Sequence, residues 1–360
     1  MLHLRERVFY PQDFQSEQSL LPNPSAFETH TLDFCRVWWQ GKRTFSLFTS
    51  GSTGTPKKIE HTREQLIASA HATLSFLGLT ANHTALVCLP TQYIGGRMML
   101  VRGFESGMPL WILPPENNPL GHALERGWAV GFTALVPLQM ERFLQATPHL
   151  VSKLADTQAI ILGGAPISAS LEERLQKVPC PMYSTYGMTE TVSHVALRRL
   201  NGPERSEAYT LLPEIEAETD DRECLRLRGA VTQDTWIQTN DRIVWTGPRS
   251  FRWLGRADHV INSGGIKIQL EEIERRIAET WRKPERFFLW GMPHEQLGET
   301  LVCMVEGSPW PASDTTQLLQ EWKEQLPTYQ APHRIMFVPT FKETPTGKIS
   351  RAVTFDQLIG

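Results

Sequence analysis

The sequence predicts an α/β fold: a large domain of parallel α/β layers with an antiparallel β subdomain, followed by a small α+β domain. Three observations support this prediction. Short apolar runs end at turn residues, helical patterns lie between them, and a different pattern of short strands begins after about residue 200. The 360 residues suffice for one large and one small domain. We place these domains at residues 1–257 and 258–360.

The parallel layers are predicted from residues 46–49, 84–89 and 159–162, which read as buried strands because each apolar run stops at a turn or a Gly-rich loop. Residues 63–77 carry apolar side chains at helical spacing without a breaker. Residues 168–178 begin with a serine suited to cap a second helix. The alternation of strand, loop and helix favours a parallel sheet.

The later part of the chain predicts antiparallel structure. Short strands are expected at residues 215–218, 223–228 and 235–238, forming an antiparallel layer or a small barrel. The small domain is expected to contain helices and strands at residues 270–281, near 287, near 302, at 316–325 and at 334–338. We expect Glu271, Glu272 and Glu274 to form a solvated helix face.

Composition excludes several classes of protein. The net charge of -3 gives no basic footprint for nucleic acid. No apolar run reaches the roughly 20 residues of a spanning helix, and residues 1–11 hold no signal-peptide core. We therefore expect a cytoplasmic protein that does not insert into a membrane. The five cysteines lack C-x-x-C spacing, which predicts buried thiols rather than a zinc ribbon or disulfides.

A loop rich in glycine and hydroxyl residues is the strongest local motif. It consists of Thr49, Ser50, Gly51, Ser52, Thr53, Gly54, Thr55, Pro56 and Lys57. Glycines let backbone N–H groups approach an anion, and a lysine adds a charge suited to phosphate. The spacing differs from that of a Walker A loop. We interpret the segment as a phosphate loop, with a flexible linker as the less favoured alternative.

This loop resembles the phosphate loop of the adenylate-forming superfamily, which includes acyl-CoA synthetases, aryl-CoA ligases, peptide-synthetase adenylation domains and luciferases. Further segments resemble that family in its own order. Residues 163–166 resemble the family's G-G segment near the adenine, which implies nucleotide contacts by Gly164, Ala165 and Pro166. Residues 184–190 resemble its Y-G-x-T-E motif. This second motif implies nucleotide contacts by Thr185, Tyr186 and Gly187, and catalytic roles for Thr189 and Glu190, with Glu190 as the Mg²⁺ ligand.

The resemblance continues to the end of the chain. Asp241 and Arg256 match positions that approach the ribose and the nucleotide, although Asn240 stands where the family has glycine. Asp258 falls at the family's hinge, and the loop with Gly264 and Gly265 matches the one that lines the route of CoA. Residues 345–351 resemble the P-x-T-x-G-K motif, one residue shorter, which makes Lys348 the catalytic lysine. A fixed ammonium there would stabilise negative charge as the acyl-adenylate forms.

The acid is suggested by residues 89–99 and 189–196, which, with the short chain, resemble compact o-succinylbenzoate–CoA ligases of menaquinone synthesis. That acid has a second carboxylate, which needs cationic or hydroxyl partners when it is buried. Gln92, Tyr93, Arg97 and His194 are the candidates, with Ser193 as a further donor. A surface salt bridge for Arg97 and a core position for His194 are the alternatives.

The resemblance thus implies an ATP-dependent acid–CoA ligase that forms an acyl-adenylate, with ATP, Mg²⁺ and coenzyme A as cofactor and co-substrates. Its partners would be a small carboxylic acid and CoA. The alternatives are another acyl-CoA or aryl-CoA synthetase, an adenylation module that loads a carrier protein, and a catalytically inactive nucleotide-binding protein. The loop begins at residue 49, so the resemblance also implies an N-terminally shortened member.

Overall fold

The computed structural model describes residues 1–16, 20–49, 57–343 and 349–359. Two compact units emerge. The first unit comprises Met1–Ala217, Arg226–Ile237 and Thr246–Phe251. The second unit comprises Glu218–Leu225, Gln238–Trp245 and Arg252–Gly360. The predicted α/β class is confirmed, with a large mixed sheet and a separate small sheet covered by helices.

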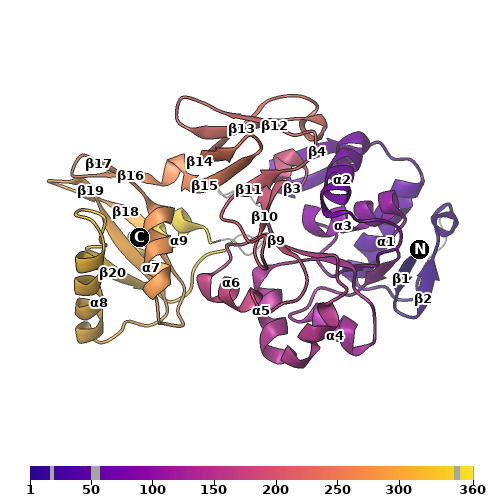
Figure 1. The fold of residues 1–360 in the computed structure, drawn as a ribbon, viewed down its shortest axis with the longest axis horizontal. Helices are drawn as coiled ribbons and strands as arrows, with labels where there is room; N and C mark the ends of the chain where they lie inside the picture. The colour runs from indigo at the N-terminus through magenta and orange to yellow at the C-terminus, as the bar shows by residue number, and fades with distance from the viewer. Residues whose placement is uncertain (17–19, 50–56, 344–348, 360) are drawn as a thin grey trace. The chain divides into compact units, whose positions relative to one another are not determined.

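In the described part of the first unit, α-helices alternate with strands along most of the chain (Figure 1). The helices are α1 (Ala26–Trp39), α2 (Arg63–Leu77), α3 (Ile94–Ser106), α4 (Pro119–Glu125), α5 (Pro137–Ala146) and α6 (Ala169–Leu175). Its strands are β1 (Leu2–Leu4), β2 (Arg7–Phe9), β3 (Thr44–Thr49), β4 (Lys57–Thr62), β5 (Ala85–Val87), β6 (Leu110–Ile112), β7 (Phe132–Leu135), β8 (Ala159–Leu162), β9 (Met182–Gly187), β10 (His194–Arg199) and β11 (Tyr209–Leu211).

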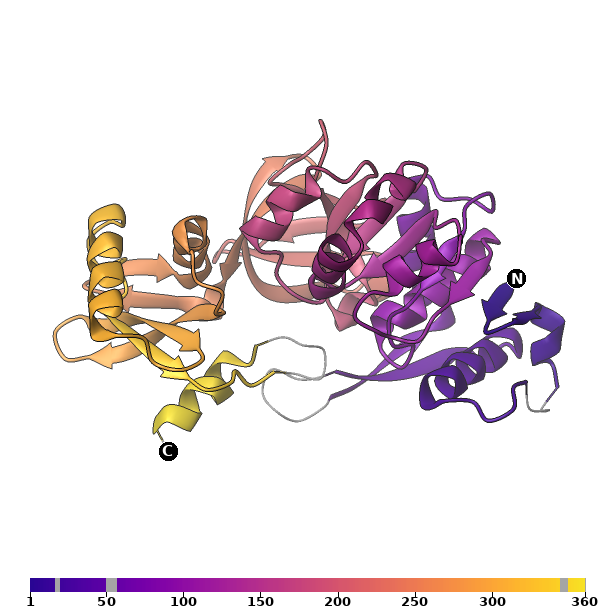
Figure 2. The same cartoon turned by 90° about the horizontal axis from the view of Figure 1, so that it is seen from below.

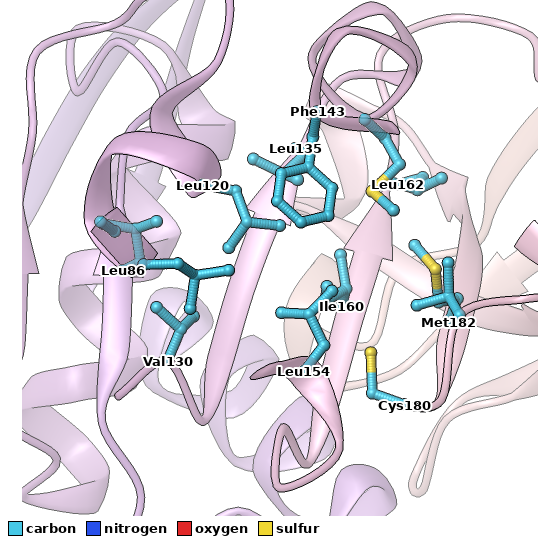
Figure 3. Packing of buried hydrophobic residues seen from close by; sticks show 14 of the residues in the cluster. Leu86, Leu120, Val130, Leu135, Phe143, Leu154, Ile160, Leu162, Cys180 and Met182 are labelled. Carbon is cyan, nitrogen blue, oxygen red and sulfur yellow. The ribbon is translucent and has the colours of Figure 1, made fainter. Parts of the chain in front are cut away.

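Parallel pairing occupies the centre of the large sheet. The parallel neighbours run in the order β1, β6, β5, β7, β8 and β9, and antiparallel pairs follow from β9 to β10 and from β10 to β11. Every residue of β5, β7 and β8 is buried, as expected for strands covered on both faces. Figure 3 shows Leu86, Leu135, Ile160 and Leu162 from these strands packing with Phe143 of α5.

Local sequence explains the helix that was predicted most clearly. The Thr62 side chain caps α2 by accepting a hydrogen bond from the Gln65 backbone, and the Gln65 side-chain oxygen accepts one from the Thr62 backbone N–H. Gly78 ends the helix in the left-handed conformation at φ 63°. The observed bounds, Arg63–Leu77, agree with the prediction.

The sheet order continues through β12 (Glu216–Thr219), β13 (Cys224–Arg228), β14 (Ile237–Gly247) and β15 (Ser250–Arg256). Antiparallel strands were predicted near β12 and β13 and at the start of β14, whereas β15 was not predicted. These strands extend the edge of the large sheet, with β15 next to β11, and the boundary between the two units falls within them. Asp220 lies in the turn between β12 and β13 and accepts hydrogen bonds from the Arg222 and Cys224 backbones.

The second unit ends in a five-stranded sheet with helices on both faces (Figure 2). Its strands are β16 (Val260–Ser263), β17 (Ile266–Gln269), β18 (Phe287–His294), β19 (Gly298–Glu306) and β20 (Arg334–Val338). Its helices are α7 (Leu270–Thr280), α8 (Ala312–Gln325) and α9 (Arg351–Ile359). Helices α7 and α8 pack on one face, and Phe355 of α9 packs on the other.

Two general predictions can be compared with this structure. All five cysteines are free and buried, as predicted. Among the described residues, no helix has both the length and the apolar composition needed to cross a bilayer.

Candidate active site

The predicted phosphate loop connects the two strands of a hairpin. Thr49 at the end of β3 pairs with Lys57 at the start of β4, so the two ends of the loop are neighbours in an antiparallel ladder. The strand before the loop was predicted, and its antiparallel partner β4 was not. Ser50, Gly51, Ser52, Thr53 and Gly54 lie outside the described residues.

The two segments predicted near the adenine lie together at the carboxyl ends of β8 and β9. These strands pair in parallel, with Leu162 opposite Ser184. Gly163 lies against Thr185 so closely that a Cβ atom at Gly163 would sit 2.4 Å from the Thr185 hydroxyl. The parallel pairing therefore brings Gly164, Ala165 and Pro166 next to the strand that carries Tyr186. Gly164 and Pro166 are exposed and Ala165 is half-buried, which leaves this segment accessible to a ligand.

Tyr186 belongs to an aromatic cluster. Its half-buried ring packs edge-on against Phe251, with centroids 5.3 Å apart, and lies 5.8 Å from Tyr209. Gly187, the next residue, faces β10, where a Cβ atom would lie 2.3 Å from the Ser193 carbonyl oxygen. Tyr209 and Phe251 come from distant parts of the sequence, and no local pattern there predicts their contact with Tyr186.

Thr189 and Glu190 form a single 3-10 turn, Thr189–Thr191, after β9. The Thr191 hydroxyl accepts a bond from the Met188 backbone and donates to the Ser193 carbonyl at 2.8 Å, which fixes the turn from inside. Glu190 is exposed. The turn ends at Val192 with φ 66°, an unusual conformation for a β-branched residue and one found at strained functional sites.

His61 of β4 is a residue that sequence analysis missed. It is 2% exposed, and neither ring nitrogen makes a well-formed hydrogen bond with a described residue. Burial lowers the pKa of His61 and nearby Arg97 adds to this, while the Thr189 backbone and the Glu190 carboxylate oppose it. His61 therefore connects the strand after the phosphate loop electrostatically to the turn that carries Glu190.

A buried chain of polar side chains runs between α2, α3 and β10. The Thr73 hydroxyl lies 3.0 Å from Nε2 of His194, and Nδ1 of His194 lies 3.5 Å from the Ser193 hydroxyl. Ser193 in turn accepts a hydrogen bond from Nη2 of Arg102 at 3.1 Å. Burial, and secondarily the Arg102 charge, holds the pKa of His194 well below its ordinary value, so this imidazole is neutral.

Arg102, which sequence analysis also missed, is the charged member of this chain. Its side chain is 1% exposed, and its remaining side-chain contact is with the Met99 sulfur. Within the described residues, Nε has no hydrogen-bond partner and no carboxylate pairs with this guanidinium. Burial lowers the pKa of Arg102 to about 9, so the group is still a cation at neutral pH. A buried cation without an anion is costly, and an anionic ligand would relieve that cost.

The other predicted acid-binding residues lie at the start of α3. Gln92 is exposed, and Tyr93 is the half-buried residue that precedes the helix. Arg97 donates to the Ser46 carbonyl of β3 at 3.2 Å and lies 5.0 Å over the Phe34 ring. Arg97 thus links α3 to the strand that leads into the phosphate loop, and its Nε has no hydrogen-bond partner among the described residues.

The second unit holds the predicted ribose and hinge residues. Asp241 in β14 is 9% exposed and accepts a hydrogen bond from Nε1 of Trp253 at 3.2 Å. Arg256 holds Asp258 through two contacts of 2.9 and 2.7 Å, so the predicted nucleotide and hinge residues form an ion pair.

The predicted CoA loop and catalytic lysine also belong to the second unit. Gly264 and Gly265 form the turn between β16 and β17, both with positive φ. Lys348 lies outside the described residues.

The Mg²⁺ ion implied by the resemblance can be compared with the available ligands. No group of three or more metal-binding side chains occurs among the described residues. Mg²⁺ bound through nucleotide phosphates and water needs one or two protein carboxylates, which the exposed Glu190 can supply. The donor set therefore fits an ion that arrives with a nucleotide.

Comparison with known proteins agrees with this arrangement. Residues 25–226 match the family described as AMP-binding enzyme. The 2-succinylbenzoate–CoA ligase of Listeria monocytogenes is 28% identical over 337 residues, covering 87% of this chain and 70% of that protein.

Solved structures of adenylate-forming enzymes are also similar to this chain. An acyl-CoA synthetase (AMP-forming)/AMP-acid ligase II-like protein from Dyadobacter fermentans is 41% identical, covers 95% of this chain and 96% of its own, and has a TM-score of 0.63. The o-succinylbenzoate CoA synthetase of Bacillus subtilis, solved with ATP and magnesium, shares the fold at 21% identity and a TM-score of 0.73, over 86% of this chain and 69% of that one. The chain belongs to the AMP-binding enzyme family.

Proposed function

We propose that this chain is an ATP-dependent acid–CoA ligase that works through an acyl-adenylate and that its acid is o-succinylbenzoate. The buried Arg102 carries the choice of acid, because it is a cation without a carboxylate from the described residues. An acid with two carboxylates can present one for activation and the other to this arginine. The similarity to 2-succinylbenzoate–CoA ligases supports the same choice.

The proposed nucleotide site uses the motifs described above. The phosphate loop, Thr49 to Gly54 with Lys57, holds the β- and γ-phosphates. Gly164, Ala165 and Pro166 contact the adenine, together with Thr185, Tyr186 and Gly187. Asp241 accepts the ribose hydroxyls, and Arg256 approaches the nucleotide.

The proposed chemistry of the first half-reaction depends on three residues. Thr189 offers a hydroxyl to the α-phosphate, and Glu190 would hold Mg²⁺, which supplies positive charge at the phosphates. Lys348 stabilises the charge shared by the acyl carboxylate and the α-phosphate as the acid attacks and pyrophosphate leaves.

The proposed acid site is the end of the buried polar chain. Arg102 pairs with the second carboxylate, and Ser193 and His194 orient the guanidinium and add hydrogen-bonding capacity. A neutral His194 suits this position, because a second cation beside Arg102 would raise the cost of the empty site. Gln92, Tyr93 and Arg97 remain candidates for the entrance at the start of α3.

In the proposed second half-reaction, residues 258–360 turn about Asp258, and the loop of Gly264 and Gly265 lines the route of the CoA thiol. The thiolate then attacks the mixed anhydride and AMP leaves. The buried free cysteines fit a reducing compartment, so we place this reaction in the cytoplasm, within menaquinone synthesis.

The experiment is AMP release with ATP, Mg²⁺ and CoA, measured with o-succinylbenzoate, benzoate, a medium-chain fatty acid or no acid. The proposal expects turnover with o-succinylbenzoate and background rates elsewhere. Turnover with another acid would reject the substrate and retain the ligase. Acyl-adenylate formation without CoA thioester would favour a carrier-protein adenylation module. No turnover with any acid would reject the ligase.

A further inference from the structure

Helices α7 and α9 of the second unit are joined by a largely buried ion pair. Nη2 of Arg351 donates to Oε2 of Glu274 at 3.0 Å, and Nη1 lies 2.9 Å from Oε1. The two side chains are 19% and 17% exposed. Oε1 of Glu274 also accepts a hydrogen bond from the Leu289 backbone at 2.7 Å. This finding corrects the expectation that Glu274 belongs to a solvated helix face.

The ion pair connects helices that pack on opposite faces of the sheet, beside the edge strand β18. Leu289 packs in the cluster that contains α7 residues, and its neighbour Phe288 packs on the opposite face with Phe355 of α9. The Arg351 guanidinium lies 5.6 Å over the Phe288 ring. Glu274 therefore reaches past the strand and contacts the first residue of α9.

The residues on both sides of 344–348 are fixed as well. Ser350 donates its backbone N–H to the Lys342 carbonyl at 2.7 Å, and Glu343 forms a bridge with Ile349. Arg286 contacts Glu343 at 2.5 Å. Glu343 and Ile349 are thus each held by contacts with described residues, and the Glu274–Arg351 pair lies two residues beyond Ile349.

The energetics of the pair favour a positional role. Burial raises the pKa of Glu274 above its ordinary value even though Arg351 acts in the opposite direction. The effect of burial on the Glu274 pKa is therefore larger than the opposing effect of the Arg351 charge. Such pairs contribute little net stability, and fixing a geometry is a better account of their presence.

We propose that Glu274 is a positioning residue for acyl-adenylate formation, acting through Arg351 on the segment that carries Lys348. The inference rests on the proposed function, in which Lys348 stabilises the first transition state, and it uses only residues that flank that lysine. A misplacement of about 1 Å at a reacting group can cost about 100-fold in rate. Thioester formation does not use Lys348 in this scheme, so it should not depend on Glu274.

The test compares Glu274→Gln with Glu272→Gln. Glu272 lies on the same helix and pairs with Arg276 at 3.0 Å, but both side chains are well exposed. Adenylate formation is measured as exchange of pyrophosphate into ATP with o-succinylbenzoate. Thioester formation is measured from synthetic acyl-adenylate and CoA. We expect Glu274→Gln to slow exchange about 10- to 100-fold and to leave thioester formation within about 2-fold. Glu272→Gln should change neither rate.

Two further variants separate position from folding. Arg351→Lys keeps the charge and loses the contact through two guanidinium nitrogens. It should therefore slow pyrophosphate exchange less than Glu274→Gln does, and it should likewise leave thioester formation unchanged. Glu274→Gln added to Lys348→Ala should cost no further exchange activity, since the lysine it positions is gone.

Three results would overturn the inference: equal loss of both half-reactions, an additive loss in the double variant, or no difference from Glu272→Gln. Failure of the proposed function would be distinguishable from these results. The unmodified protein and Glu272→Gln would then both lack exchange with every acid, and the inference would fail together with the proposed function.

Discussion

Two buried arginines, one in each unit, stand in opposite electrostatic situations. Arg351 has Glu274 as its partner. Arg102 is more deeply buried and contacts only a hydroxyl and a sulfur among the described residues. A buried arginine that the chain itself neutralises can hold two elements together. A buried arginine that the chain leaves without a carboxylate is prepared for an anion from outside. The contrast separates a structural role from a binding role for the same residue type.

Loss of the unneutralised arginine should have the largest effect. Arg102→Met removes the partner of a buried carboxylate, which costs several kcal/mol and should raise the KM for o-succinylbenzoate about 100-fold. The KM for ATP should stay unchanged. Arg97→Ala, five residues away on the same helix, should raise the acid KM less. Steady-state kinetics with each substrate varied would show this, and an unchanged acid KM would remove Arg102 from the site.

The same pair of arginines should differ in stability. Arg351→Met leaves Glu274 buried and unpaired, which should lower the free energy of unfolding by about 3 kcal/mol. Arg102→Met removes a charge that no carboxylate of the described residues neutralises, so it should leave the thermal midpoint unchanged or higher. Thermal unfolding of the two variants without ligands gives the answer. Equal destabilisation would mean that Arg102 is neutralised within the protein after all.

The pH dependence of stability should reveal the protonation of His194. Its pKa lies well below the ordinary 6.5 in the folded protein, so as the pH falls the imidazole is protonated in the unfolded chain before it is protonated in the folded protein. The contribution of neutral His194 is therefore fully present above pH 6.5 and is lost as the pH falls below it, by up to about 1.4 kcal/mol per pH unit. His194→Gln should flatten this part of the thermal midpoint curve, whereas an equally steep curve in the variant would assign the loss to other groups.

The smallest effect is expected for an exposed arginine. Arg5 and then Ser25 lower the pKa of Glu28 to about 2, so this stabilisation is present above about pH 4.5 and is lost as the pH falls toward 2. Because Arg5 is 44% exposed, Arg5→Gln should cost only about 1 kcal/mol at neutral pH. Urea unfolding at pH 7 and at pH 3 should show the full cost at the higher pH and a smaller cost at the lower pH. An equal cost at both values would exclude the ion pair as its source.

Local sequence predicted much of the fold but not all of the site. The bounds of α2, β8 and β20 follow from local periodicity and turn residues, and the predicted family and fold are confirmed. Arg102 was missed because its burial comes from contacts with residues distant in sequence: α3 packs against α2, and Arg102 donates a hydrogen bond to Ser193. The available signal was the continuous apolar run at residues 98–101, which is typical of a helix buried on all sides.

Contacts between distant residues explain the other misses. His61 meets the turn of Thr189 and Glu190 through tertiary packing, and Tyr186 meets Phe251 only because β11 lies between β10 and β15. Glu274 resembles any surface carboxylate in a charged helix until α9 folds back onto β18. Single-sequence periodicity identifies which face of an element is apolar, but it does not identify which distant polar group that element will meet.

The most direct test of the account is the specificity of the unmodified protein for the second carboxylate. The value of kcat/KM would be measured for o-succinylbenzoate and for its analogue without the ring carboxylate, with CoA and ATP saturating. We expect a preference of about 100-fold or more for o-succinylbenzoate, since the analogue leaves Arg102 buried and unpaired. Equal values for the two acids would contradict the central claim that Arg102 receives a carboxylate of the substrate.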